Sequence, residues 1–198
     1  SQIDPVLPSG TGINLGGTKN VLGCFKQPEF VICDPAMLRT LPEDEYFSGL
    51  AELIKTALIG NAKLFELIEN NHEGIAKRDQ DLLSMCISMA VNFKAAVVSE
   101  DEKEAGLRRI LNFGHTYGHV IEVYKSFRHG YAVASGMELA AKFSLSKGLI
   151  TPEECNRIIN LLKSFRLLRK HDIPDEQLSQ LIMRDKKKAG NDIYFVFL

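Results

Sequence analysis

Hydrophobic positions recur at three- and four-residue spacing along most of the chain from residue 42 onward. Phe47, Leu50 and Ile54 are early examples, and this spacing places them on one face of a helix. Thr151 followed by Pro152 and two glutamates is a typical helix start, with threonine as the N-cap. The same spacing predicts helices from Pro42 onward and over residues 62–76, 79–101, 114–126, 130–148, 152–165 and 175–184.

Strands are expected in few places. Residues 1–28 are rich in glycine, proline, serine and asparagine, which predicts loop with at most short pieces of structure. The apolar run Phe30–Asp34 is bounded by prolines and predicts one strand, and residues 192–198 predict another. A chain of 198 residues without an internal repeat is expected to form one domain. The predicted fold class is mainly α, with one or two short strands.

Composition narrows the class of protein. The chain is 45% hydrophobic and 25% charged with a net charge of −1, which is typical of a globular protein and leaves no basic surface for nucleic acid. No apolar run approaches the ~18 residues of a membrane span, and no signal-peptide pattern opens the sequence. The four cysteines form no CxxC motif, so reduced thiols of a cytoplasmic protein are expected.

The densest chemical feature lies between residues 108 and 129. His115 and His119 are four residues apart, so on a helix they share a face within reach of one metal ion. Asn112 and Gly114 come just before that helix, where free N–H groups and the helix dipole suit an anion. His129 follows after a short loop. Coincidental spacing is the alternative, but a third histidine close by favours a metal site.

A metal site of this kind usually needs a carboxylate. Glu52 is the best candidate, since its neighbours are apolar and a charge there is costly unless it is paired or metal-bound. Lys55 lies on the same helical face, so an ordinary Glu–Lys pair is the alternative. Scattered basic residues could together form a pocket for a carboxylate or phosphate. Each of them alone could instead be a solvated surface charge. They are Lys19 beside Asn20, Lys55, Lys94, Arg108 and residues 186–188.

Several motifs resemble those of the dehydroquinate synthases. Residues 106–119 read Gly-Leu-Arg-x-x-Leu-Asn-Phe-Gly-His-Thr-x-Gly-His, which is similar to that family's signature. Residues 129–137 follow as His-Gly-x-Ala-Val-Ala-x-Gly-Met, and residues 49–55 read Gly-Leu-Ala-Glu-x-Ile-Lys. Lys19-Asn20 and Asp185-Lys186-Lys187 also match, so the resemblance covers essentially the whole chain in the right order.

The resemblance implies a fold and a reaction. Enzymes of this family have a Rossmann-like NAD domain followed by a helical domain, with the active site between them. They convert 3-deoxy-D-arabino-heptulosonate 7-phosphate into 3-dehydroquinate and phosphate, a step of aromatic amino-acid biosynthesis. NAD transiently oxidises the C5 hydroxyl, which acidifies the neighbouring C–H and lets phosphate leave. Zn²⁺ (or Co²⁺), NAD and a homodimer are therefore expected of the full-length enzyme.

The resemblance also implies roles for individual residues. Glu52, His115 and His129 correspond to the metal ligands, and His119 becomes a catalytic residue on the phosphate side instead of a ligand. Lys55 corresponds to the second catalytic residue. The substrate-binding positions are Asp4, Lys19, Asn20, Lys94, Arg108, Asn112 and one of Lys186 and Lys187.

Two departures from the family pattern leave alternatives open. No dinucleotide-binding loop precedes Ser1, so the chain by itself is expected to be inactive. Gly10 stands where the family has a substrate-binding lysine, whose charge-assisted hydrogen bond is worth about 1.5–3 kcal/mol. Two alternatives to dehydroquinate synthase therefore stay open. One is another sugar-phosphate cyclase, such as 2-deoxy-scyllo-inosose synthase, and the other is a non-catalytic metal-binding domain. Lys94 and Arg108 suit a substrate carboxylate and favour dehydroquinate synthase, while the Asn-x-Gly-His-Thr element disfavours a polyol dehydrogenase.

Overall fold

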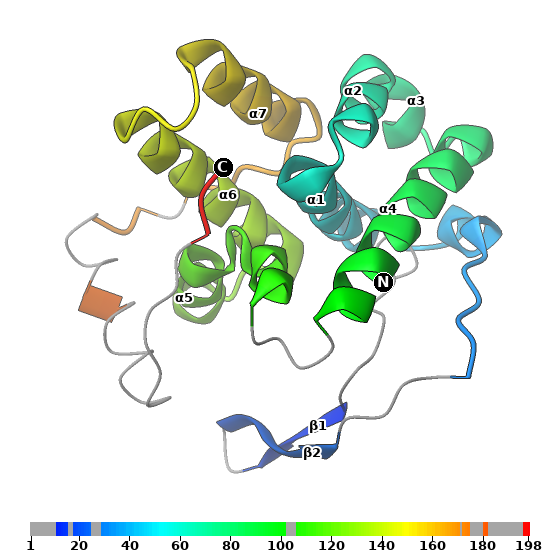
Figure 1. Cartoon of the computed structure of the whole chain (residues 1–198), viewed down its shortest axis with the longest axis horizontal. Helices are drawn as coiled ribbons and strands as arrows, with labels where there is room; N and C mark the ends of the chain where they lie inside the picture. The colour runs from blue at the N-terminus through cyan, green and yellow to red at the C-terminus, as the bar shows by residue number, and fades with distance from the viewer. Residues whose placement is uncertain are drawn as a thin grey trace.

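A predominantly helical body forms most of the chain in the computed structural model (Figure 1). Side chains are described for residues 29–101, 106–170, 172–174, 180–181 and 196–198, and the backbone alone for residues 11–15 and 18–24. The α-helices are α1 Glu43–Gly60, α2 Ala62–Asn70, α3 His72–Ala76, α4 Gln80–Glu100, α5 His115–Lys125, α6 His129–Ser146 and α7 Pro152–Ser164. The remaining elements are the 3₁₀ helices η1 Pro35–Arg39 and η2 Leu107–Asn112 and the strands β1 Thr11–Leu15 and β2 Thr18–Cys24.

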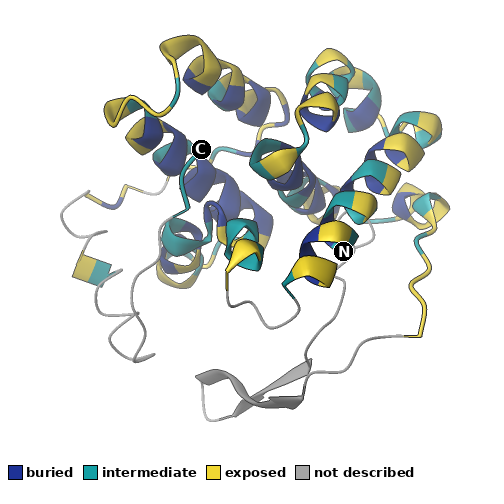
Figure 2. Cartoon of the chain, in the orientation of Figure 1, coloured by how far each residue is buried: buried dark blue, intermediate teal, exposed yellow. Residues whose placement is uncertain are grey.

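Helix α6 is the centre of this body. It packs against α5, α1 and α7, and Figure 2 shows buried residues along most of its length. Its inner positions are apolar and often small, including Ala132, Ala134 and Ala141, none of which is exposed. Small side chains allow neighbouring helices to approach closely, so α6 can contact several helices at once.

Two glycines set the closest approaches to α6. A Cβ on Gly136 would collide with the carbonyl oxygen of Gly114, just before α5. A Cβ on Gly130 would collide with the backbone of Ser48 in α1, and the Gly130 N–H donates to the Ser48 hydroxyl at 3.0 Å. The first contact holds the beginning of α5 against α6, and the second holds the beginning of α6 against the first half of α1.

The two strands form an antiparallel hairpin that lies apart from the helices (Figure 1). Ile13 pairs with Leu22 and Thr11 with Cys24. The mainly α prediction with one or two short strands is confirmed, although the strands lie within residues 1–28, where only short pieces of structure were expected.

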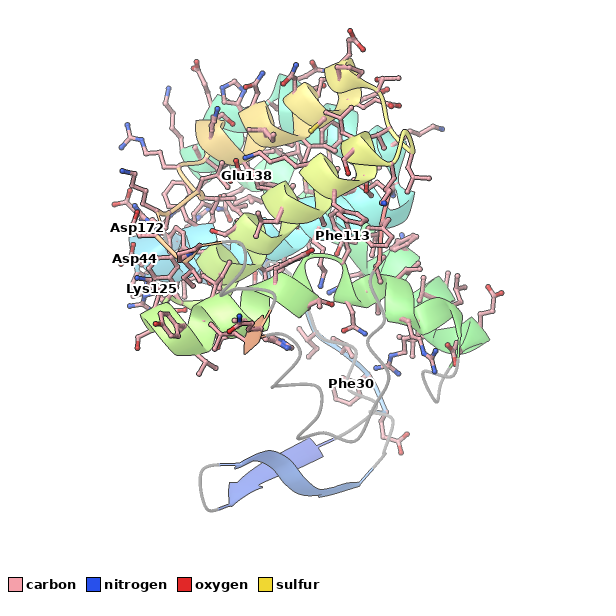
Figure 3. The ribbon with its side chains drawn as sticks, turned by 90° about the vertical axis from the view of Figure 1, so that its left-hand side faces the viewer. Phe30, Asp44, Phe113, Lys125, Glu138 and Asp172 are labelled. Carbon is pink, nitrogen blue, oxygen red and sulfur yellow. The ribbon has the colours of Figure 1, made fainter. Side chains whose placement is uncertain are left out.

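The prediction of a strand over Phe30–Asp34 is wrong. This segment contains no regular structure, and the exposed fractions of Phe30 and Ile32 are 75% and 76%. Figure 3 shows Phe30 on the segment between the hairpin and the helices, whereas Phe113 lies within the helical body. An apolar run becomes a strand only where another strand pairs with it, and no described strand does. The Asp34 side chain instead accepts a hydrogen bond from the Ala36 N–H and caps η1.

Three other predicted elements differ from the structure or are only partly described. The helix expected over residues 62–76 is divided at Asn71 into α2 and α3. Residues 196–198 are not in a strand; the N–H of Leu198 donates to the Ser144 hydroxyl at 3.2 Å, and residues 192–195 lie outside the described part. Of the predicted helix 175–184, only residues 180–181 are described, and they are helical.

The remaining helices agree with the prediction within one or two residues at each end. Helix α7 begins with a complete capping box, in which the Thr151 hydroxyl accepts from the Glu154 N–H and the Glu154 carboxylate accepts from the Thr151 N–H. The N-cap that the sequence predicted is therefore confirmed.

Helix α4 differs from the expectation that no apolar segment is long enough for a membrane. By length and composition alone it could span a bilayer, the one such helix among the described residues. A core helix passes the same test, and α4 places residues such as Leu83, Cys86 and Ile87 in the core beneath α1 and α2.

Cysteine chemistry agrees with the sequence in the described part. Cys33, Cys86 and Cys155 are free thiols, as expected, while the side chain of Cys24 lies outside it. Burial raises the pKa of the Cys86 thiol to about 11, so this thiol stays protonated and packs as a small apolar side chain.

Candidate metal centre

A buried ion pair lies in the middle of α1. The Lys55 ammonium donates to Oε2 of Glu52 at 2.7 Å, and only 5% and 13% of the two side chains are exposed. Burial alone would raise the pKa of the Glu52 carboxyl, but Lys55 and the two nearby histidines outweigh it and hold the pKa well below its usual range. The sequence allowed an ordinary surface Glu–Lys pair; in the structure Glu52 and Lys55 do pair, but they are largely buried.

His115 is the first residue of α5, and its ring approaches Glu52. Gly114 precedes it with φ of +75°, a left-handed conformation that glycine adopts without strain. Nδ1 of His115 lies 3.2 Å from the carbonyl oxygen of the buried Phe113, so Nδ1 donates and Nε2 keeps its lone pair. Nε2 lies 3.7 Å from Oε1 of Glu52. Burial first, and then the Lys55 charge, lower the pKa of His115 to about 4, so the ring is neutral at pH 7.

His129 begins α6 and reaches the same carboxylate oxygen. Its Nε2 lies 3.2 Å from Oε1 of Glu52, and its Nδ1 lies 3.0 Å from Oε2 of Glu122. The Glu52 carboxylate raises the pKa of His129, Glu122 adds to the effect, and partial burial opposes it. The two histidines beside Glu52 thus have opposite pKa shifts, because burial and the Lys55 charge dominate at His115 whereas the contact with Glu52 dominates at the more exposed His129.

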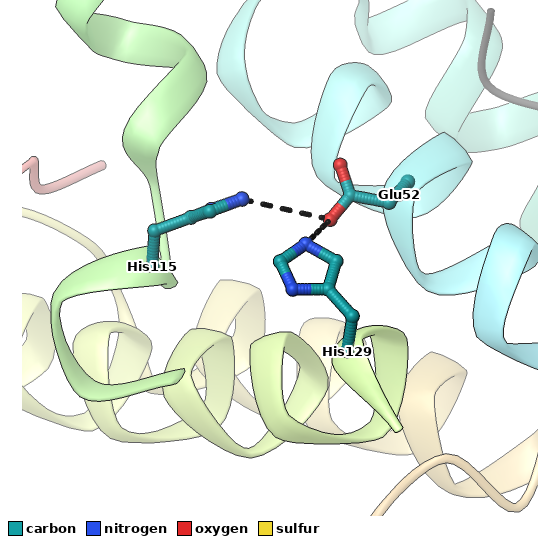
Figure 4. A group of neighbouring side chains, drawn as sticks. All are labelled: Glu52, His115 and His129. Atoms are coloured by element: carbon teal, nitrogen blue, oxygen red, sulfur yellow. Dashed lines mark ion pairs between the residues drawn. The ribbon is translucent and has the colours of Figure 1, made fainter. Parts of the chain in front are cut away.

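Together these side chains form a compact group of possible metal ligands (Figure 4). One atom each from Glu52, His115 and His129 lies within 4.8 Å of the others. In a tetrahedral zinc site with bonds of about 2.0 Å, ligand atoms are roughly 3.3 Å apart. The two distances at Oε1 of Glu52, 3.2 and 3.7 Å, fall on either side of that value.

The hydrogen bonding of this group suits a cation. Oε1 of Glu52 is buried and accepts no hydrogen bond from the described residues. With Nδ1 of His115 and of His129 donating elsewhere, each ring in its neutral form points a lone pair at that oxygen. Three acceptors facing one another need a positive charge between them, either a proton on His129 or a metal ion. The residues present therefore fit a zinc-like ion with two nitrogen ligands and one oxygen ligand.

His119 lies beside this group without belonging to it. Its ring centroid is 5.3 Å from that of His115 and 6.1 Å from that of His129. One helical turn separates His119 from His115 on α5, so the spacing correctly placed both on one side of the helix. The chain fold, however, places His129 against Glu52, and the assignment of His119 to the substrate side stays a prediction.

The predicted substrate-binding residues are only partly described. Lys94 is a buried lysine on α4, while Arg108 and Asn112 lie on η2, which packs against α4 and α1. The Arg108 N–H donates to the Asp101 carboxylate at 2.9 Å, which fixes the start of η2. Five substrate-binding candidates lie outside the described side chains, as does Gly10, which stands where the family has a lysine: Asp4, Lys19, Asn20, Lys186 and Lys187.

Glu122 is the residue at this site that the sequence analysis missed. Its carboxylate touches His129. A signal existed, because Glu122 lies three residues after His119 and seven after His115, spacings that place all three on the same face of a helix. Nothing in the sequence indicated that α6 would begin beside that face.

The family model described as the C-terminal part of 3-dehydroquinate synthase matches residues 49–188. The chain belongs to this family. The model of the N-terminal part of 3-dehydroquinate synthase matches residues 1–48, so the two matches meet within α1.

Curated relatives resemble the chain along its whole length. A 3-dehydroquinate synthase from Dehalococcoides mccartyi is 40% identical over 201 residues, which cover 100% of this chain and 56% of the relative. One from Dictyoglomus thermophilum is 43% identical over 199 residues, again 56% of its length. The chain thus spans little more than half the length of the curated relatives it matches.

Solved structures share the fold. The 2-epi-5-epi-valiolone synthase ValA from Streptomyces hygroscopicus, with NAD⁺ and Zn²⁺ bound, superposes with a TM-score of 0.85 at 27% identity, covering 95% of this chain and 53% of ValA. A 2-deoxy-scyllo-inosose synthase complexed with carbaglucose-6-phosphate, NAD⁺ and Co²⁺ gives 0.79 at 28% identity, covering 92% of this chain and 51% of that one. Both are cyclases related to the family.

Proposed function

We propose that the chain provides the metal-binding and part of the substrate-binding side of a 3-dehydroquinate synthase active site. The reaction converts 3-deoxy-D-arabino-heptulosonate 7-phosphate into 3-dehydroquinate and phosphate. The observation that supports this most directly is the convergence of Glu52, His115 and His129 in a chain of this family. Zn²⁺ or Co²⁺, the ions of the two cyclase structures, suits these ligands, and NAD would be the redox cofactor.

The ligand residues have distinct tasks in this proposal. Glu52 supplies the negative charge, and His115 and His129 supply neutral nitrogen lone pairs. A bound Zn²⁺ would act as a Lewis acid that polarises the substrate hydroxyl to be oxidised. Lys55, held 2.7 Å from Glu52 in a buried position, can orient a substrate hydroxyl and stabilise negative charge on its oxygen.

The remaining predicted residues would bind the two anionic ends of the substrate. His119 borders the ligand group and can donate to a phosphate oxygen or accept its proton. Lys94, Arg108 and Asn112 are assigned to the carboxylate and phosphate. Asp4, Lys19, Asn20 and one of Lys186 and Lys187 are proposed from the family motifs alone. A homodimer in the cytoplasm, with no nucleic-acid or membrane partner, also stays a prediction.

Zinc content tests the metal site first. We expect one zinc ion per purified wild-type chain at neutral pH, and almost none in Glu52→Ala or His115→Ala, as measured by plasma emission spectrometry. His72→Ala is the matched control because His72 lies on α3, where its ring packs against Phe165. No zinc in the wild-type chain, with the ion supplied, would overturn the metal site and the function together.

Phosphate release tests the reaction. This chain would be joined to the remaining part of the Dehalococcoides mccartyi relative and supplied with zinc, NAD and the sugar phosphate. We expect phosphate release that Glu52→Ala abolishes. Bound zinc without phosphate release would leave a metal site but reject the proposed reaction.

A second sugar-phosphate cyclase activity is the competing function, since both solved structures are of such enzymes. The same chimera would be given glucose 6-phosphate, which lacks the carboxylate that Lys94 and Arg108 are proposed to bind. Turnover of glucose 6-phosphate in preference to the carboxylated substrate would favour the alternative. The 40% identity to curated 3-dehydroquinate synthases supports the first proposal.

A further inference from the structure

Glu122 connects α5 to the first residue of α6. Its Oε2 lies 3.0 Å from Nδ1 of His129, and 21% of its side chain is exposed. Ser126, with φ of 53°, ends α5 in a left-handed conformation, and the chain then turns so that His129 comes back beside Glu122. The contact therefore depends on how the two helices are joined as well as on residue type.

This contact determines which ring nitrogen of His129 is available. A carboxylate only accepts hydrogen bonds, and a neutral ring has one proton to donate; the shorter of its two carboxylate contacts, 3.0 Å from Nδ1 to Glu122 against 3.2 Å from Nε2 to Glu52, favours the proton on Nδ1. Nε2 then keeps its lone pair and lies 3.2 Å from Oε1 of Glu52, in the proposed ligand group. Metal-binding histidines are commonly oriented by a carboxylate in this way.

The two histidine ligands differ in what else holds them. His115 is largely enclosed, with 14% of its side chain exposed, and its Nδ1 faces the backbone carbonyl of Phe113. His129 is 44% exposed at the start of α6, so packing alone restrains its ring much less. Its orientation depends on its polar partners, and Glu122 is the one that faces Nδ1.

We propose that Glu122 is a positioning residue that holds His129 in the tautomer and orientation in which Nε2 faces the metal site. The proposal rests on the proposed function, because it assigns the ring to that site. It adds a residue that acts on the metal through His129 and does not itself bind the ion.

The first test needs no metal. Ring ¹⁵N chemical shifts of His129 would be measured in the metal-free chain, at a pH high enough for the ring to be neutral. We expect the Nδ1–H tautomer to dominate in the wild type and a mixture of tautomers in Glu122→Gln, because an amide can donate to Nδ1 as well as accept from it. Glu122→Asp, whose carboxylate is one methylene shorter, is the second variant and should also give a mixture.

Glu138→Gln is the matched control. Glu138 lies on α6, 24% of its side chain is exposed, and its carboxylate pairs with the Lys142 ammonium at 2.7 Å. It resembles Glu122 in exposure and in having a charged partner, but it does not touch the ligand group. We expect its variant to keep the wild-type His129 shifts.

The second test measures metal binding. Zinc affinity, determined by competition with a chromophoric chelator, should fall roughly 10- to 100-fold in Glu122→Gln and stay unchanged in Glu138→Gln. The visible absorption bands of the Co²⁺-loaded chain should also shift, because a rotated His129 changes the ligand field. An unfolding curve of Glu122→Gln that matches the wild type would show that the changes in tautomer and affinity do not come from a loss of folding.

The outcomes separate the two proposals. Wild-type His129 shifts and wild-type zinc affinity in folded Glu122→Gln or Glu122→Asp would overturn the role of Glu122 while leaving the metal site intact. A tautomer change in a chain whose wild type binds no zinc would show that Glu122 orients the His129 ring, but it would overturn the metal site and with it the positioning role for the metal.

Discussion

Glu52 places a negative charge inside the helical body, beside one lysine and two histidines. The Lys55 contact compensates that charge in the metal-free chain, while His115 resists protonation and His129 favours it. Charge at this site is therefore balanced among four side chains, and the protonation states of Glu52, His115 and His129 depend on one another. Changing pH or removing one partner should disturb that balance measurably.

Stability of the metal-free chain should fall as pH falls below about 6.5. The folded chain holds the pKa of His115 at about 4, while an unfolded chain takes up that proton near pH 6.5, so acid favours unfolding over this interval. The contribution is up to about 3 kcal/mol. The lowered pKa of Glu52 acts in the same direction at lower pH. The raised pKa of His129 acts in the opposite direction only above pH 6.5, since its stabilisation is complete below pH 6.5 and is lost as pH rises through the folded pKa.

Urea unfolding between roughly pH 7 and pH 4.5 measures this dependence. The decrease in unfolding free energy should be smaller in His115→Gln than in the wild type, because the glutamine does not titrate. An equal decrease in both proteins would show that His115 is not responsible.

Replacing Lys55 by methionine should destabilise the metal-free chain by about 3 kcal/mol, because a buried carboxylate then lacks its closest positive partner. Zinc should recover much of that loss, since the ion can compensate the same charge. Chemical unfolding with and without zinc measures both effects. Lys142→Met is the control: Lys142 pairs with Glu138 at the same 2.7 Å but is 56% exposed, so its change should cost about 1 kcal/mol or less, with or without zinc.

At the scale of elements, the site depends on how closely α1, α5 and α6 approach. Gly136 contacts the backbone of Gly114 and Gly130 contacts that of Ser48, so neither position has room for a side chain. The glycines of the family motif therefore act as packing residues: they determine how close the first residues of α5 and α6, His115 and His129, come to the neighbouring helices. From the sequence, Gly114 was expected only at an anion-binding helix start, and that role stays a prediction.

Gly136→Ala should lower the unfolding free energy by about 1–3 kcal/mol, because the added methyl forces α5 and α6 apart. Zinc affinity should fall with it, since His115 moves relative to His129. Thermal unfolding and chelator competition measure the two effects. Ser146→Ala, on the exposed end of α6, should leave both unchanged; unaltered zinc affinity in Gly136→Ala would contradict the packing argument.

At the scale of the whole molecule, the candidate ligands come from two consecutive helices and from a third that is distant in sequence. Glu52 lies within α1, while His115 and His129 begin α5 and α6. An ion bound to all three would link the first half of the helical body to the second. Binding to the folded chain alone should then stabilise the body as one cooperative unit.

Zinc should raise the unfolding free energy of the wild-type chain by about 2.7 kcal/mol when free zinc is 100 times the dissociation constant. Calorimetry with and without the ion, followed by chelation with EDTA, measures the gain and its reversal. Glu52→Ala should show no gain. A comparable gain in that variant would place the bound zinc elsewhere.

Sequence alone determined most of the helices and the chemical identity of the site. Periodicity and the Thr151 cap located the helices because these signals depend on residues within one or two turns. The motif around His115 indicated metal chemistry for the same reason. The run Phe30–Asp34 was misread because a strand needs a partner, and the partner is a property of the whole fold.

Only the tertiary structure decided which side chains meet. From spacing alone, His115 pairs with His119, yet His129 is the histidine beside Glu52, as the family resemblance implied. The turn after α5 brings α6 back against α1, and it also places Glu122 on His129. Helical spacing shows only which residues share one face of one helix, whereas this metal site needs ligands from three helices. Whether those ligands come together depends on packing contacts between helices, such as those of Gly130 and Gly136.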